Sequence, residues 1–74
     1  MTTPLFDTTL VRDEHVRSFK VRTATPAGWE ASECEDQRVV QHRRYRDWHR
    51  LERALARFTR EVAELRALGW REAL

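Results

Sequence analysis

The chain has 74 residues, of which 41% are hydrophobic and 35% are charged, and its formal net charge is only +2. This length allows one small domain, and the hydrophobic fraction is well above that of a disordered chain. The single cysteine excludes an intramolecular disulfide and favours a reducing, cytoplasmic location. We expect neither a signal peptide nor a membrane span, because the N-terminus has no basic start and no apolar run approaches ~20 residues.

The charges are distributed unevenly along the chain. Residues 1–36 carry four basic and seven acidic side chains, which gives −3, whereas residues 37–74 carry ten arginines and five acids, which gives +5. An acidic part and a basic part can complement each other within the chain, between two copies, or with an external anion. Lys20 is the only lysine, and arginine is the better residue for planar, bidentate pairing.

Residues 1–14 show neither a helical nor an alternating period. We interpret them as a partly ordered N-terminal tail, because chain ends are poorly ordered unless other contacts hold them. Two apolar pairs, Leu5-Phe6 and Leu10-Val11, indicate that some of this tail docks on the remainder of the chain. The single small α+β domain is then expected over residues 15–74.

Three strands are predicted after this tail. Alternating residues indicate a first strand at about residues 15–24. Residues 25–28, Thr-Pro-Ala-Gly, fit a hairpin turn with glycine in the left-handed position, and residues 29–35 are expected to return as the second strand, with a bulge near its end. A polar break at residues 35–38 separates it from a third strand at residues 39–45. The pattern of the third strand does not decide which of its faces is buried.

One long helix is predicted from about residue 48 to residue 68. Asp47 can cap its N-terminus, and Gly69 suits the left-handed position that follows a helix. Apolar residues spaced three and four apart predict a single core-facing side. These residues are Trp48, Leu51, Ala54, Leu55, Phe58, Val62 and Leu65.

The predicted fold class is therefore α+β, a three-stranded antiparallel sheet (meander) followed by one long C-terminal helix packed on one face (βββα). A helix of this length measures about 31 Å, whereas seven-residue strands span about 23 Å. We therefore expect part of the apolar stripe to extend past the sheet. Because the spacing also resembles that of a coiled coil, we expect the extended part to form a homodimer.

A stripe of arginines with the same spacing occupies an arc of about 80° on the side of the helix opposite the core. It comprises Arg46, Arg50, Arg53, Arg57 and Arg60, and Arg43, Arg44, His42 and His49 extend it. Like charges four residues apart, and cations near a helix N-terminus, each destabilise a helix slightly, so an anionic partner would relieve these penalties. The alternative is a solvated face that pairs with the chain's own glutamates, Glu30, Glu33 and Glu35.

Residues for several kinds of chemistry are missing. The candidate metal ligands, His15, Cys34, His42 and His49, do not have a recognised ligand spacing. Two glycines in the whole chain exclude a glycine-rich phosphate loop, and a core of this size leaves little room for a catalytic pocket. We expect no metal site, no cofactor, no small-molecule substrate and no enzymatic activity.

The predicted function is that of a small non-enzymatic binding or adaptor protein whose arginine ridge engages an anionic partner. The predicted partner-binding residues are Arg43, Arg44, Arg46, Arg50, Arg53, Arg57 and Arg60. The partner is either an acidic protein surface or a nucleic acid, and the low net charge and the acidic first half of the chain favour the acidic protein. Trp48 and Phe58 point toward the core, which leaves Tyr45, Trp29 and Trp70 for base stacking. The alternative function is a structural, self-assembling homodimeric subunit in which the ridge contacts the glutamate-rich second strand of a neighbour.

Overall fold

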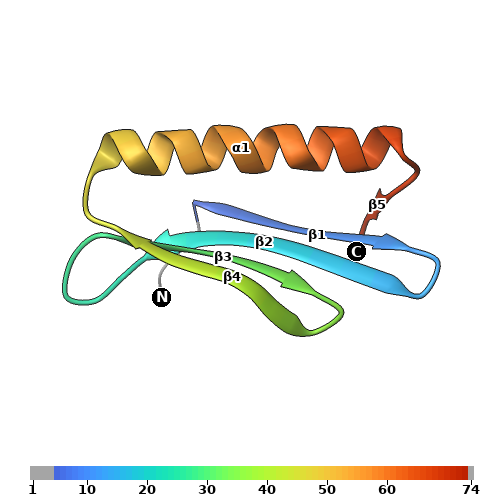
Figure 1. Cartoon of the computed structure of the whole chain (residues 1–74), viewed down its shortest axis with the longest axis horizontal. Helices are drawn as coiled ribbons and strands as arrows, with labels where there is room; N and C mark the ends of the chain where they lie inside the picture. The colour runs from blue at the N-terminus through green and yellow to red at the C-terminus, as the bar shows by residue number, and fades with distance from the viewer. Residues whose placement is uncertain (1–4, 74) are drawn as a thin grey trace.

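Five strands and one helix make up the part of the chain that the computed structural model describes, residues 5–73. They follow in the order β1 (Phe6–Arg12), β2 (His15–Thr23), β3 (Trp29–Glu35), β4 (Arg38–Tyr45), α1 (Trp48–Ala67) and β5 (Arg71–Glu72). All strands are antiparallel and form one sheet with the order β4-β3-β2-β1-β5. After β4 the chain turns back, and α1 runs lengthwise over one face of the sheet (Figure 1).

The predicted α+β class is confirmed, but the βββα order is wrong in its number of strands. Residues 6–12, which we assigned to the tail, form β1 and pair along their whole length with β2. An inward-facing threonine, Thr8, and an outward-facing valine, Val11, blur the alternation that would have predicted this strand. β5 has two residues and pairs with Leu10 and Val11, so it is too short to leave a periodic signal. Residues 1–4 of the predicted tail lie outside the described residues.

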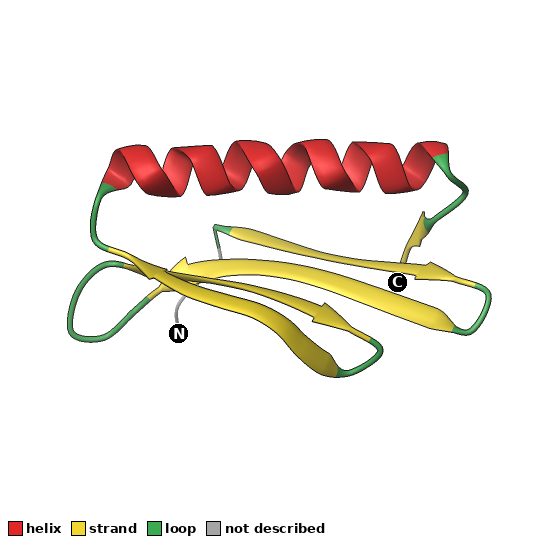
Figure 2. Ribbon diagram, viewed as in Figure 1, coloured by secondary structure: helices red, strands yellow, loops and turns green. Residues whose placement is uncertain are grey.

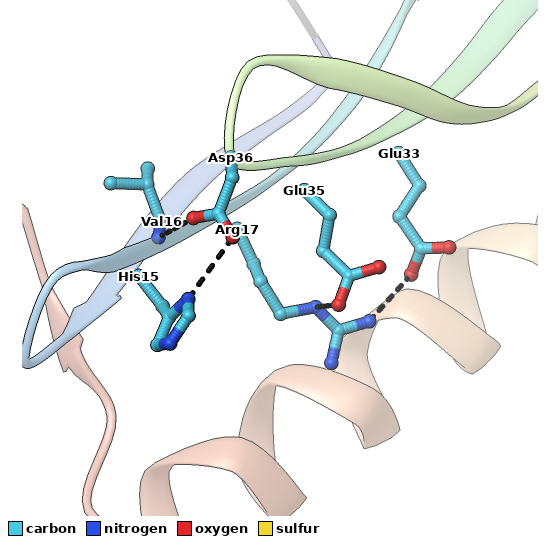
Figure 3. A network of polar contacts seen from close by, with 6 residues as sticks. All are labelled: His15, Val16, Arg17, Glu33, Glu35 and Asp36. Atoms are coloured by element: carbon cyan, nitrogen blue, oxygen red, sulfur yellow. Dashed lines mark hydrogen bonds and ion pairs between the residues drawn. The ribbon is translucent and has the colours of Figure 1, made fainter.

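The turn between β3 and β4 shows how a fully polar break forms a tight hairpin without glycine. Asp36 and Gln37 both have positive φ, 49° and 70°, as a two-residue type I′ turn requires. The Asp36 carboxylate accepts a hydrogen bond from the backbone N–H of Val16 at 2.9 Å and lies 3.0 Å from His15 Nδ1 (Figure 3). The predicted bulge is also present, between Glu33 and Cys34.

The hydrophobic core lies between the sheet and α1, which form two layers joined by short loops (Figure 2). Its buried members are Leu10, Phe19, Val21 and Ala31 from the sheet and Leu51, Ala54, Phe58, Val62 and Leu65 from the helix. Phe58 is central, because its ring centroid is 5.2 Å from that of Phe19 and 5.9 Å from that of Phe6. Trp48 is 47% exposed and packs edge-on against Trp29, with the two ring centroids 5.4 Å apart.

The helix ends agree with the prediction. The Asp47 side chain accepts a hydrogen bond from the backbone N–H of His49 at 3.0 Å, and Gly69 follows the helix with φ 100°. Burial continues from Leu51 to Leu65, so the sheet covers α1 along its length and the expected overhang is absent within residues 5–73. No helix in this range combines the length and the apolar character that a bilayer span needs.

Candidate anion-binding surface

Three adjoining hollows lie where β4 ends and α1 begins. Their volumes are about 520, 440 and 490 Å³, and Tyr45 and Arg50 line all three. Between them the hollows are lined by six of the seven predicted arginines, Arg43, Arg44, Arg46, Arg50, Arg53 and Arg57. We call these six residues, together with Tyr45, the arginine surface. Arg60 lines none of the three hollows, so the structure does not place it in this surface.

The arginine surface exists because α1 lies beside the edge strand of the sheet. β4 is the terminal strand of the sheet order, so its outer edge is open to solvent. Arg43 from β4 lines the same hollow as Arg53 and Arg57 from α1, and Arg57 Nη2 donates a hydrogen bond to Gln41 Oε1 of β4 at 3.4 Å. The arginine stripe therefore lies on the flank of the helix above β4. The expected position opposite the core is wrong for Arg57, which is only half-exposed.

Four members of the arginine surface have no carboxylate partner within the described part of the chain. Among residues 5–73, no ion pair within 4.0 Å involves Arg43, Arg46, Arg50 or Arg53. Four guanidinium groups around adjoining hollows produce a strong local positive potential, although the net charge of the whole chain is small. The N-terminus of α1 lies at the same place, but the Asp47 carboxylate caps it and lines the first hollow, so this acid offsets part of the positive potential there.

The other two arginines are held by neighbours. Arg44 Nη2 donates to the backbone carbonyl of Thr25 at 2.9 Å, and its Nε is 3.8 Å from a Glu30 carboxylate oxygen. Arg57 Nε is 4.0 Å from a carboxylate oxygen of Glu61. These contacts hold Arg44 against the loop between β2 and β3 and Arg57 against the next turn of α1.

The loop between β2 and β3 forms one wall of the surface. Pro26 and Ala27 line the second hollow together with Tyr45, and Gly28 lets the loop approach the end of β4. Gly28 has φ 88°, and a Cβ at this position would collide with the carbonyl oxygen of Tyr45. Only glycine therefore permits this close approach between the loop and the backbone that carries the arginines.

The glutamates of β3 are occupied elsewhere in the chain. Arg17 lies between Glu33 and Glu35, with nitrogen to oxygen distances of 3.2 and 4.0 Å (Figure 3). Glu30 contacts Arg22 at 3.4 Å, in addition to Arg44. Among residues 5–73, the alternative in which Glu30, Glu33 and Glu35 neutralise the arginine surface therefore holds for Arg44, while Arg57 pairs with Glu61 instead.

A carboxyl pair marks the other end of the helix flank. Burial raises the pKa of Glu61, and the neighbouring Glu33 raises it further through a hydrogen bond and through its charge. Arg57 and Arg17 oppose this change but do not reverse it.

The sequence predicted the basic residues of this surface but not its shape. Tyr45, at the centre of the hollows, was recognised only as an aromatic available for stacking, and the wall formed by Pro26 and Ala27 was missed because loop packing leaves no periodic signal. Residues 5–73 contain no group of three or more His, Cys, Asp or Glu side chains placed to hold a metal ion. Comparisons with protein-family models, with curated proteins and with solved structures found no match for this chain.

Proposed function

We propose that this protein is a non-enzymatic binding module whose arginine surface engages an anionic macromolecule. The observation that carries the proposal is the convergence of six arginines on adjoining hollows, four of them without a carboxylate partner among residues 5–73. Guanidinium groups form charge-assisted, bidentate hydrogen bonds with phosphate and carboxylate groups. A partner rich in either group would neutralise this cluster.

The structural, self-assembling subunit is the competing proposal. It requires the glutamates of β3 in a neighbouring copy to meet the arginines. Glu30, Glu33 and Glu35 already lie within 4.0 Å of cationic side chains in their own chain, so pairing with a neighbour would first break those contacts. The external anion is therefore favoured over the second copy.

Binding to polyanions across a salt series tests the proposal. Fluorescence anisotropy with labelled oligonucleotides and with labelled polyglutamate measures affinity between ~50 and ~200 mM salt, the range in which phosphate-dependent binding falls steeply. If four arginines each neutralise one phosphate, log K falls against log salt with a slope of about −3 for a single strand. Failure of every polyanion to bind at the lowest salt concentration would contradict the proposal.

A matched pair of double variants localises the binding. Arg50→Gln with Arg53→Gln removes two charges from the arginine surface, and Arg12→Gln with Arg71→Gln removes two charges from β1 and β5 at the opposite side of the sheet. The first variant is expected to bind more weakly and to reduce the slope by about 1.4, and the second to retain the native slope. Equal losses of binding affinity in the two variants would mean that binding depends only on the overall charge of the protein. Sedimentation at low and high salt tests the competing proposal, which requires a salt-sensitive dimer.

A further inference from the structure

We infer that the anionic partner is a single-stranded nucleic acid, whose phosphates contact the arginine surface while one unpaired base stacks on Tyr45. The inference rests on the proposed function and specifies the class of its partner. It starts from the one member of the surface that is not an arginine, since Tyr45 lines all three hollows and presents an aromatic ring instead of a guanidinium group.

Tyr45 is positioned as a fixed aromatic platform. It is half-buried, packs against the hydrophobic core, and lies opposite Trp29 in the pairing of β3 with β4. The loop at Gly28 lies so close to the Tyr45 backbone that an added Cβ would collide with its carbonyl oxygen. An acidic peptide needs cations but not an aromatic residue on the floor of the site, whereas unpaired bases stack on aromatic side chains beside a positively charged groove.

The position of Tyr45 selects a single strand over a duplex. Tyr45 is half-buried at the end of the edge strand, and it lines two of the hollows together with Arg43 and Arg50. A base can reach such a floor only when it leaves the stack of a duplex. Arg50 and Arg53 follow one another on α1 at about one helical turn, or ~5.4 Å, so a flexible strand can place successive phosphates against them.

An acidic peptide added to the free edge of β4 is the strongest competing partner. Such a peptide would form backbone hydrogen bonds with residues 38–45. Arg46 and Arg50, which line the two hollows nearest the junction, lie beyond the last residue of β4. The hollows are lined by the last residues of β4 and extend beyond that strand onto α1, so an added strand would contact only part of the surface, which favours the nucleic acid.

The decisive experiment uses the native protein and two single strands of equal length and charge. One is a labelled oligothymidylate of about ten nucleotides, and the other is the same sugar-phosphate backbone without bases. Stacking of one base predicts that the oligothymidylate binds about 5- to 150-fold more tightly, with the same salt dependence for both strands. Equal affinities would overturn the inference, and tighter binding of a matched duplex would overturn it as well.

Two substitutions assign the stacking to Tyr45. Tyr45→Phe retains an aromatic ring and is expected to preserve the preference for the strand with bases, whereas Tyr45→Leu is expected to lose it. Thermal unfolding shows whether each variant is folded, and if Tyr45→Leu is not, the comparison of the two strands on the native protein still decides. Retention of the preference in folded Tyr45→Leu would refute the role of Tyr45.

Labelled polyglutamate of the same charge separates this inference from the proposed function. If polyglutamate binds as tightly as the oligothymidylate, the partner class is wrong while the anion-binding function stands. If no polyanion binds at low salt, both the proposed anion-binding function and the inferred partner class are wrong. The expected result is that polyglutamate binds no more tightly than the strand without bases.

Discussion

Replacing Gly28 with alanine is expected to destabilise the protein more than the same change at Gly69. Both glycines have positive φ, 88° and 100°, where an L-residue costs about 1 to 2 kcal/mol. Their surroundings differ. A Cβ at Gly28 would collide with the carbonyl oxygen of Tyr45 and lie 3.4 Å from its carbonyl carbon, whereas a Cβ at Gly69 would meet only the Arg12 side chain, at 3.9 Å.

The difference in unfolding free energy between the two variants measures the steric contribution of the contact with the Tyr45 backbone. Overpacking against groups that cannot move away costs about 1 to 3 kcal/mol, and the Tyr45 backbone is held in β4 by its pairing with β3. We therefore expect Gly69→Ala to lose about 1 to 2 kcal/mol and Gly28→Ala about 2 to 5 kcal/mol. In a domain of this size 1 kcal/mol corresponds to about 4 to 8 °C in Tm.

Thermal and urea unfolding, followed by circular dichroism, measure both variants under identical conditions. Equal destabilisation would show that the loop moves away from Tyr45 at no cost and would refute the close-approach argument. The same displacement would open the wall formed by Pro26 and Ala27, so folded Gly28→Ala is also expected to bind polyanions more weakly than folded Gly69→Ala. Unchanged binding would mean that this wall contributes nothing to the site.

Three further substitutions test other parts of the structure. Phe58→Ala is expected to cost about 3 to 5 kcal/mol, which approaches the whole stability of such a small core, so circular dichroism should show a largely unfolded protein at 25 °C. Glu61→Gln should stabilise the protein at pH 7. Burial and Glu33 raise the pKa of Glu61, so its contribution to folding stability is complete below the usual value of 4.5 and is lost as the pH rises through the folded pKa. Urea unfolding should therefore show no gain in stability for the variant near pH 4. A gain in stability that is independent of pH would contradict the reasoning. In Asp36→Asn the amide oxygen can still accept the hydrogen bond from the backbone N–H of Val16. The raised pKa of His15 should nevertheless fall toward its usual 6.5, which an NMR titration would measure. An unchanged pKa would mean that Asp36 does not cause the shift.

Short-range signals were sufficient to predict three strands and the helix. The predicted ranges 15–24, 29–35 and 39–45 differ from β2, β3 and β4 by no more than one residue at any end. Alternation, an aspartate before the helix and a glycine after it all act within a few residues of the element they define. They are therefore readable without knowledge of the rest of the chain.

Long-range pairing explains what was missed. β1 has an irregular apolar pattern and becomes a strand because β2 offers it a complete pairing partner. β5 consists of two residues that pair with Leu10 and Val11, about sixty positions earlier in the chain. No local propensity identifies so short a strand, since its stability comes from the edge of a sheet that the rest of the chain has already formed.

The candidate surface was likewise predictable from the sequence only in part. The spacing of arginines along α1 determined that several of them share one stripe, and six of the seven predicted residues line the hollows. The tertiary structure decided which strand lies beside that stripe, left Arg60 outside the three hollows, and made Tyr45 a lining residue of all three. Helical period specifies an angle around the helix axis, but the neighbour at that angle depends on the sheet order and on the short connection through Arg46 and Asp47, which are properties of the whole fold.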